Sequence, residues 1–239
     1  MGQEVGARVP SPAAPTVEQL TRVVALDGPA GTGKSTVCRL VAQRLGWRFV
    51  DTGATYRAVT LAVLRSGADP EDPEAAERAA RAADIQLLTD ADAPGVLLDG
   101  SDVSGDIRTP EVTAAVSAVS SHPGVRALLV DLQRRSMGTD GAVVEGRDIA
   151  TVVAPLAGLK VFLDARPEVR AMRRAGELSG PEPEDATSVQ RALAARDARD
   201  NQTNPLVPSG GAVHLDTSDL TLDQVVDAVV DLVTQAGLR

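Results

Sequence analysis

The feature that most constrains this chain is a glycine-rich run at residues 28–35, which matches the pattern GxxxxGK[ST] in full. Its lysine, Lys34, is one of only two lysines in the sequence. In this pattern, backbone N–H groups and the N-terminus of a following helix surround the phosphates of a nucleotide. The lysine bridges the β- and γ-phosphates, and the final hydroxyl, here that of Ser35, holds Mg²⁺. The run therefore predicts binding of a nucleoside triphosphate.

The segments on either side of the run have the order that this chemistry requires. Residues 22–27 form a short apolar run typical of a β-strand, and residues 35–45 predict a helix that ends at Gly46. Strand, glycine loop and helix then follow one another, as the pattern demands. The predicted ATP-binding residues are Gly28, Pro29, Ala30, Gly31, Thr32, Gly33, Lys34, Ser35 and Thr36.

Composition favours a helix-covered parallel sheet in a cytoplasmic protein. Hydrophobic residues make up 43% of the chain but aromatic residues only 2%, so the core must be built from Val, Leu and Ala. The single cysteine, Cys38, allows no internal disulfide, and its place in the predicted helix favours a buried side chain. No apolar run reaches membrane-spanning length, and the N-terminus lacks a secretory pattern. We expect no membrane partner.

The charge of the chain argues against a nucleic-acid partner. The formal net charge is −9, whereas proteins that bind nucleic acids usually present a basic face. An acidic protein that binds polyphosphate must hold its positive charge locally. We therefore expect arginines to gather in one cleft.

Short apolar runs alternate with helical patterns along the chain, which predicts an α/β fold with a central parallel sheet flanked by helices. A Pro-rich segment, residues 1–20, is interpreted as a disordered leader. The strands are predicted at residues 23–26, 47–50, 142–144, 159–163 and 212–215, with an antiparallel element at 85–88 and 96–98. The helices are predicted at residues 35–45, 54–67, 74–83, 111–135 with a break at His122-Pro123, and 222–233.

Two polar motifs follow predicted strands and so lie where ligands gather on a parallel sheet. In the first, residues 51–57, Thr52, Tyr56 and Arg57 suit the phosphate of a second substrate, although Thr52 could equally cap a helix and Arg57 face solvent. In the second, residues 145–148, Glu145 suits a position near Mg²⁺ or its water. Arg147 there suits a phosphate clamp, with a structural pair to Asp148 as the alternative.

Further arginines belong to predicted helices. Arg170, Arg173 and Arg174 precede a flexible break at residues 179–183, which we interpret as the tip of a mobile flap. Such arginines neutralise charge during phosphoryl transfer, although arginines on helices are usually solvated. Arg126 could reach a base or remain a surface charge. The two histidines, His122 and His214, have no partner at metal-ligand spacing and are interpreted as structural.

Five strings of this sequence together resemble the bacterial cytidylate kinases. They are residues 27–34 (DGPAGTGK), 51–57 (DTGATYR), 102–108 (DVSGDIR), 118–120 (AVS) and 145–148 (EGRD), and the match covers almost everything from residue 23 onward. The resemblance implies a P-loop kinase fold over residues 21–239. It includes a monophosphate-binding insertion at about residues 68–110 and a lid at about residues 172–195.

The resemblance also implies an activity and its residues. The activity is phosphorylation of CMP and dCMP by ATP with Mg²⁺, in a monomer with no nucleic-acid partner. It implies Lys34, Arg147 and Arg173 as catalytic residues, and Ser35 as the Mg²⁺ ligand with Glu145 nearby. The implied CMP-binding residues are Thr52, Tyr56, Arg57, Ser117, Arg126, Arg147, Asp148, Arg196 and Asp200.

The chain departs from the family pattern after Asp200. Thr203 stands where an arginine is usual, and residues 201–204 lead directly into Pro205-Leu206, so the segment is shortened. This puts one contact near the ribose and base in doubt, and Arg199 is a candidate to replace it.

Two other functions remain open on the sequence. A kinase of this fold acting on UMP or another small acceptor is disfavoured by the set Ser117, Arg126 and Asp148, because uracil lacks the amino donor of cytosine. A non-catalytic nucleotide switch of the GTPase type is disfavoured because the chain has no Asn-Lys-x-Asp sequence; its second lysine, Lys160, precedes Val161.

Overall fold

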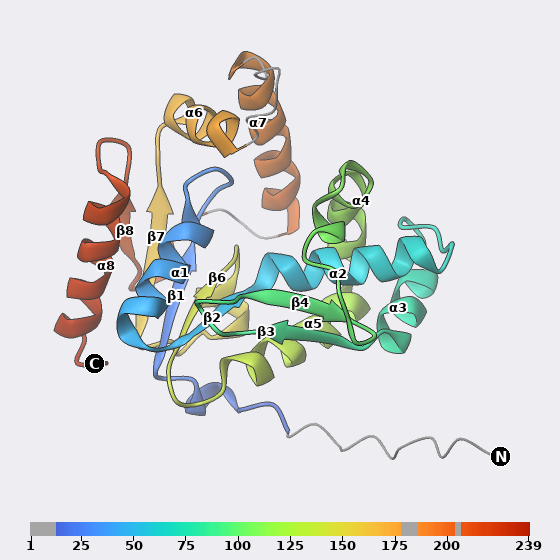
Figure 1. The fold of residues 1–239 in the computed structure, drawn as a ribbon, viewed down its shortest axis with the longest axis horizontal. Helices are drawn as coiled ribbons and strands as arrows, with labels where there is room; N and C mark the ends of the chain where they lie inside the picture. The colour runs from blue at the N-terminus through green and yellow to red at the C-terminus, as the bar shows by residue number, and fades with distance from the viewer. Residues whose placement is uncertain (1–12, 178–185, 204–206) are drawn as a thin grey trace.

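The computed structural model describes residues 13–177, 186–203 and 207–239. They form a fold built on a five-stranded parallel sheet (Figure 1). The strand order is β2-β6-β1-β7-β8. Every pair in this sheet is parallel, as the sequence predicts. The strands are β1 (Val23–Asp27), β2 (Arg48–Asp51), β6 (Ala142–Glu145), β7 (Leu159–Asp164) and β8 (Val213–Asp216).

The central strand β1 is buried along its whole length because both faces of the sheet are covered. Val24 and Leu26 pack with the helices α1 and α8 on one face, where Cys38 is also fully buried. Val23 and Ala25 point to the other face and pack in a second cluster. The helices that flank the sheet are α1 (Lys34–Leu45), α8 (Leu222–Gln235), α5 (Pro123–Met137) and a π-helix (Ile149–Val153).

Regular structure is present on the N-terminal side of the predicted leader boundary. Within residues 13–20, Val17–Gln19 form a 3₁₀ turn, and Leu20 is fully buried in the cluster that also contains Val23. Leu20 therefore belongs to the core. The rest of the predicted leader, residues 1–12, lies outside the described residues.

A second layer of elements lies beside the sheet, to the right in Figure 1. A three-stranded antiparallel sheet packs with a group of helices around a core of its own, which includes Val59, Val96 and Ile107. The predicted helix break at residues 122–123 is confirmed, with Pro123 starting α5. These elements are α2 (Thr52–Arg65), α3 (Pro73–Ala82), β3 (Ile85–Leu88), β4 (Gly95–Leu98), β5 (Ser101–Asp102), a 3₁₀ turn (Asp106–Arg108) and α4 (Pro110–Ser121).

Two further helices, α6 (Pro167–Glu177) and α7 (Ala186–Thr203), rise above the carboxyl ends of the strands in Figure 1. They contact each other and follow β7 in the chain. The tip predicted at residues 179–183 lies outside the described residues. Within the described part of the chain, no helix has both the length and the apolar character that spanning a bilayer requires.

Candidate active site

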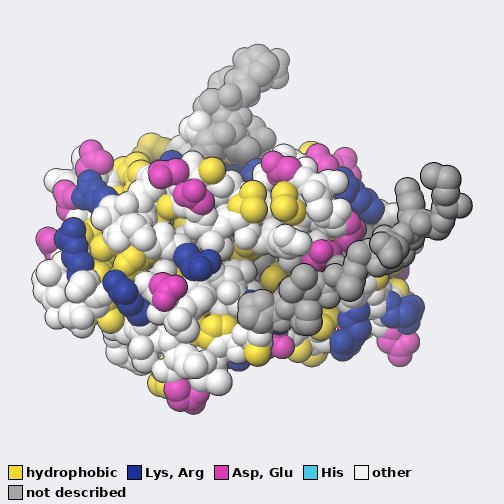
Figure 2. All heavy atoms as spheres, turned by 60° about the horizontal axis from the view of Figure 1, so that its bottom comes forward, with side chains coloured by type: hydrophobic (Ala, Val, Ile, Leu, Met, Phe, Trp, Pro, Cys, Tyr) yellow, Lys and Arg dark blue, Asp and Glu magenta, His cyan; other side chains and the backbone are white. Residues whose placement is uncertain are grey.

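A cleft of about 640 Å³ opens at the carboxyl ends of the parallel strands. Of the described side chains that line it, eight are cationic and four are anionic, although the whole chain carries a formal net charge of −9. On the face drawn in Figure 2, by contrast, acidic and basic side chains are interspersed. The expected concentration of arginine in one cleft is confirmed. The cationic residues are Lys34, Arg57, Arg108, Arg126, Arg147, Arg174, Arg196 and Arg199, and the anionic residues are Asp51, Glu145, Asp148 and Asp200.

One end of the cleft is the glycine loop between β1 and α1. Gly28 has a φ of +148°, and a Cβ built there would lie 2.1 Å from the Leu163 carbonyl oxygen of β7, so only glycine fits. The Lys34 ammonium donates to the Pro29 carbonyl oxygen at 2.7 Å, inside the loop where phosphates would bind. Burial, with the nearby Arg147 guanidinium, lowers the pKa of Lys34. Because burial disfavours its positive charge, Lys34 would gain from pairing with an anion such as a phosphate.

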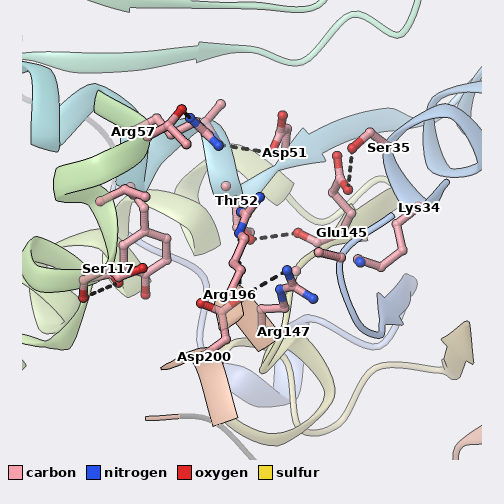
Figure 3. A pocket seen from close by; sticks show the side chains of 18 of the residues that line it. Lys34, Ser35, Asp51, Thr52, Arg57, Ser117, Glu145, Arg147, Arg196 and Asp200 are labelled. Atoms are coloured by element: carbon pink, nitrogen blue, oxygen red, sulfur yellow. Dashed lines mark hydrogen bonds and ion pairs between the residues drawn. The ribbon is translucent and has the colours of Figure 1, made fainter. Parts of the chain in front are cut away.

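Beside Lys34, the start of α1 meets the end of β6 (Figure 3). The Ser35 hydroxyl donates to Glu145 Oε2 at 2.8 Å, while the buried Glu145 Oε1 has no hydrogen-bond partner among the described residues. Burial, with the neighbouring Asp51 carboxylate, raises the pKa of Glu145. Asp51 lies next to Glu145 because β2 and β6 pair in register there.

This cluster of oxygen atoms fits Mg²⁺. The ion prefers oxygen ligands and usually combines one or two protein groups with substrate phosphates and water. A hydroxyl beside a carboxylate whose second oxygen is unpaired provides such groups. Among the described residues, no group of three or more His, Cys, Asp or Glu side chains could hold a metal without such help.

The first turn of α2 forms the next part of the wall. Asp51 caps this helix by accepting from the Ala54 N–H at 2.9 Å, so the alternative prediction of Thr52 as the N-cap is wrong. Thr52 lines the cleft and donates its hydroxyl to the Glu145 carbonyl oxygen at 2.7 Å. Arg57 reaches across to the Ile107 carbonyl oxygen at 3.2 Å and the Thr113 hydroxyl at 3.0 Å. It is therefore held by the neighbouring layer.

The far end of the cleft has a different chemistry. Arg126 of α5 forms an ion pair with Asp148, whose side chain is only 7% exposed. The Arg126 guanidinium also lies 5.9 Å from the centre of the Tyr56 ring. Burial raises the pKa of Tyr56 to about 12, so its phenol stays protonated at neutral pH. Ser117 of α4 lines the same end (Figure 3). A carboxylate, a guanidinium and hydroxyls thus surround space for a flat polar group.

Arg147 and Arg196 lie between these two ends in Figure 3. Arg147 donates to the Gly28 carbonyl oxygen at 2.6 Å and pairs with Asp200 at 3.1 Å. Arg196, on α7, lies 3.9 Å from the same Asp200 carboxylate. The cleft therefore brings together all the residues predicted to hold the second substrate.

Arg173 is placed differently from the prediction. It is not among the described residues that line the cleft; it donates to the Thr217 carbonyl oxygen at 2.7 Å and to the Thr32 carbonyl oxygen at 3.2 Å. The next residue, Arg174, lines the cleft instead. The prediction that Arg170, Arg173 and Arg174 share one helix is confirmed. Which of them turns inward depends on how α6 packs, and the sequence does not reveal this.

Other cleft residues had no predicted role. Arg108 lies in one of the strings that resemble cytidylate kinases, so the sequence carried a signal for it. Asp51 lies in another of these strings, residues 51–57, and so carried the same kind of signal. His122 and His214 are placed as predicted: His122 contacts the Pro70 carbonyl oxygen at 2.8 Å, and His214 stacks on Phe162.

Comparison with known proteins agrees with this geometry. The model of the cytidylate kinase family matches residues 24–235, which is most of the chain. The chain belongs to this family. A cytidylate kinase of Streptomyces avermitilis is 50% identical over 89% of this chain and 93% of its own length. One from Mycolicibacterium paratuberculosis is also 50% identical, over 89% of this chain and 95% of its own.

Membership of the cytidylate kinase family makes the chain a nucleotide-binding kinase, and the cleft contains what a kinase needs. The match begins at Val24 in β1 and ends at Gln235, the last residue of α8. It therefore includes both ends of the cleft and the two helices above it. The predicted kinase activity and P-loop kinase fold are confirmed.

Proposed function

We propose that this protein transfers the γ-phosphoryl group of ATP to CMP and dCMP, forming CDP and dCDP. The observation that carries the proposal is the arrangement of one cleft with a phosphate loop at one end and the Arg126–Asp148 pair at the other. Two phosphate groups would meet between these ends, where Arg147 and Arg196 lie. Membership of the cytidylate kinase family supports the same acceptor.

The far end of the cleft suits cytosine. Its N4 amino group is a donor that the Asp148 carboxylate can accept, and its O2 and N3 atoms are acceptors that Arg126 and Ser117 can serve. Uracil presents a carbonyl oxygen in place of the amino group, which would face the same carboxylate without a hydrogen bond. The pair therefore favours cytosine over uracil, and an acceptor such as UMP is the less favoured alternative.

The acceptor phosphate has its own set of groups. Tyr56, Arg57 and Arg147 would hold it, and Thr52 lies beside them at the start of α2. The half-buried Arg57 already has a lowered pKa because of desolvation and the nearby arginines, Arg196 first among them. An incoming dianion would relieve this repulsion. Arg196 and Asp200 would contact the ribose.

At the other end, the loop would bind ATP. Backbone N–H groups of residues 28–36 would surround its phosphates, and Lys34 would follow the γ-phosphate as charge develops on it. Mg²⁺, held by Ser35 with Glu145 nearby, would supply charge neutralisation between the β- and γ-phosphates. Arg174 is the arginine of α6 whose position in the cleft suits contact with the transferring group, whereas Arg173 would act from behind the loop.

Two helices above the cleft would limit the access of water. We infer that α6 and α7 belong to the lid implied at about residues 172–195, and that the elements at about residues 68–110 form the monophosphate-binding insertion. Closure on the acceptor protects the γ-phosphate from hydrolysis. All the groups invoked belong to one chain, which supports a monomer. The acidic net charge supports a protein with no nucleic-acid partner. We infer a cytoplasmic location for such a nucleotide kinase.

The proposal is tested by measuring ADP formation from ATP and Mg²⁺ with CMP, dCMP, UMP, AMP and GMP in turn. CMP and dCMP should support turnover, UMP should support at least about tenfold less, in line with one base contact, and the purine monophosphates should be inert. Lys34→Ala serves as the inactive control, because it removes the cation beside the γ-phosphate. Preference for UMP, or equal slow hydrolysis with every monophosphate, would overturn the proposal.

A further inference from the structure

Asp197 of α7 contacts the phosphate loop directly, although it is not among the described residues that line the cleft. Its Oδ1 accepts a hydrogen bond from the Ala30 N–H at 2.9 Å, and its Oδ2 accepts one from the Arg170 guanidinium of α6. The same Arg170 nitrogen donates to the Ala30 carbonyl oxygen at 3.0 Å. Both backbone polar groups of this loop residue are therefore bound by side chains from α6 and α7.

This contact is shielded from solvent. The side chains of Arg170 and Asp197 are 14% and 15% exposed, and they adjoin a buried apolar cluster of Ala30, Ala171, Val189 and Leu193. A charge-assisted hydrogen bond is strong in such surroundings, and removing one partner leaves the other buried and unpaired. The Ala30–Arg170–Asp197 contact, called the loop clamp below, therefore holds its geometry firmly.

The same carboxylate also lies near Arg147, which itself donates to the Gly28 carbonyl oxygen of the loop at 2.6 Å. Asp197 Oδ1 lies 3.8 Å from the Arg147 guanidinium, which Asp200 contacts at 3.1 Å. Asp197 and Asp200 are three residues apart on α7 and so share one face of the helix. Arg147 is the residue proposed above to hold the acceptor phosphate. One side chain thus connects the loop that would hold the donor to the arginine that would hold the acceptor.

We propose that Asp197 is a positioning residue for phosphoryl transfer, which fixes the phosphate loop relative to Arg147 through the loop clamp. This inference rests on the proposed function. Transfer requires the acceptor oxygen and the γ-phosphate to be in line, and a displacement of about 1 Å can cost about 100-fold in rate. Asp197 is not among the described residues that line the cleft, so its loss should disturb the alignment of the substrates more than the binding of either one.

The test is Asp197→Asn, which preserves the size of the side chain and an acceptor for Ala30 but removes the charge that holds Arg170 and Arg147. We expect kcat for CMP to fall about tenfold or more. The dissociation constants of CMP and of a non-hydrolysable ATP analogue, measured calorimetrically, should each change by less than about threefold. The matched control is Asp231→Asn, the same change at an exposed position on α8 that lies away from the cleft.

A double-mutant cycle with Arg170→Met separates positioning from independent effects. Because both side chains act through the loop clamp, the double variant should lose no more kcat than the worse single variant. If Asp197→Asn does not fold, Arg170→Lys, which keeps the charge but not the forked geometry, must show the same fall in kcat with binding preserved.

Several results would overturn the proposal: a kcat within about twofold of wild type, binding constants that worsen as much as kcat falls, or losses that multiply in the double variant. Wild-type protein measured beside the variants separates this outcome from the proposed function. If the wild type fails to phosphorylate CMP, the proposed function is wrong. If the wild type is active and Asp197→Asn is equally active, only the role of Asp197 is wrong.

Discussion

In the proposed function, Asp148 is the residue on which the choice of base would depend. Its carboxylate is buried, it is paired with Arg126, and it follows directly after Arg147, which lies near the middle of the cleft. An ionised carboxylate only accepts hydrogen bonds, whereas an amide can turn its NH₂ group toward the ring. On this proposal, the charge of Asp148 would favour a base that presents an amino group there over one that presents a carbonyl oxygen.

Asp148→Asn should accordingly reduce the discrimination between CMP and UMP. We expect the ratio of their kcat/KM values to fall by the equivalent of about 1–3 kcal/mol, the usual value of one well-placed base contact. The KM of ATP should not change, since the loop lies at the other end of the cleft. Steady-state kinetics with both acceptors measure this. If CMP and UMP kinetics shift together, Asp148 orients Arg147 and does not contact the base.

Arg199 is the residue that best fits the contact put in doubt by Thr203. It lines the cleft one residue before Asp200, and its Nε donates only weakly, at 3.3 Å, to the Ala195 carbonyl oxygen of its own helix. Among the described residues its guanidinium forms no ion pair, so it could contact a substrate. Whether Thr203 points into the cleft is outside what the structure describes, because its side chain is not among the described parts.

Arg199→Ala should therefore raise the KM of CMP about tenfold or more, because one charge-assisted hydrogen bond contributes about 1.5–3 kcal/mol. Adding Thr203→Arg to this variant should restore the lower KM. Both are measured at saturating ATP. An unchanged KM in Arg199→Ala, together with a lower KM in Thr203→Arg alone, would show that the contact is missing and that nothing replaces it.

At the scale of elements, the tight approach of the phosphate loop to β7 is the most demanding feature. A Cβ added at Gly28 would lie 2.1 Å from the Leu163 carbonyl oxygen, which belongs to the backbone of β7. Gly33 also has a positive φ, +86°, but a Cβ there would meet nothing within 4 Å. The two glycines therefore separate steric overlap from backbone strain.

Gly28→Ala should lower the free energy of unfolding by about 3 kcal/mol or more, since overlap adds to strain. Gly33→Ala, the matched control, should cost only about 1–2 kcal/mol because strain alone acts there. Urea denaturation of the nucleotide-free proteins measures both. Equal losses in the two variants would contradict the close approach of the loop to β7.

The order of elements could be predicted from the sequence because most of them carry a clear local pattern. The strands at the centre of the sheet are short runs of Val, Leu and Ala, and Gly46 and Pro123 mark helix ends through their own backbone preferences. The π-helix after residue 148 had no such signal. It depends on a tertiary contact, in which the buried Asp27 carboxylate accepts from the Ile149 and Ala150 N–H groups at 2.9 and 2.8 Å.

At the scale of the whole molecule, charge is distributed unevenly in a way that serves function. A cleft in which cations outnumber anions, inside an acidic protein, focuses a positive potential on the place where phosphates would bind. Solvent ions screen such a potential over about 10 Å at 0.1 M salt. Ionic strength should therefore act mainly on substrate capture.

Raising sodium chloride from about 50 to about 500 mM should increase the KM of both ATP and CMP several-fold and change kcat much less. Phosphates already held in the cleft are screened less than those that approach it. Initial rates over a matrix of salt and substrate concentrations measure this, and sucrose of equal osmolality is the control. KM values that do not respond to salt would contradict electrostatic capture by the cleft.

The candidate site could be predicted only in part, for a physical reason. Motifs that follow strands, such as residues 51–57 and 145–148, are brought together by the parallel sheet itself, so sequence order was sufficient. Residues on α6 and α7 depend on how two helices dock over the loop. This explains why Arg174 faces the cleft where Arg173 was expected, and why the contact of Asp197 with Ala30 could not be foreseen.

The most direct test follows the phosphoryl group itself. ATP labelled in its γ-phosphate is incubated with the protein, Mg²⁺ and CMP, and the labelled products are separated. The proposed function predicts that the label appears in CDP in the same amount as the ADP formed. Inorganic phosphate should stay low, because the acceptor and the proposed lid would exclude water. Label that accumulates in inorganic phosphate at the same rate with and without CMP would contradict direct transfer to the acceptor.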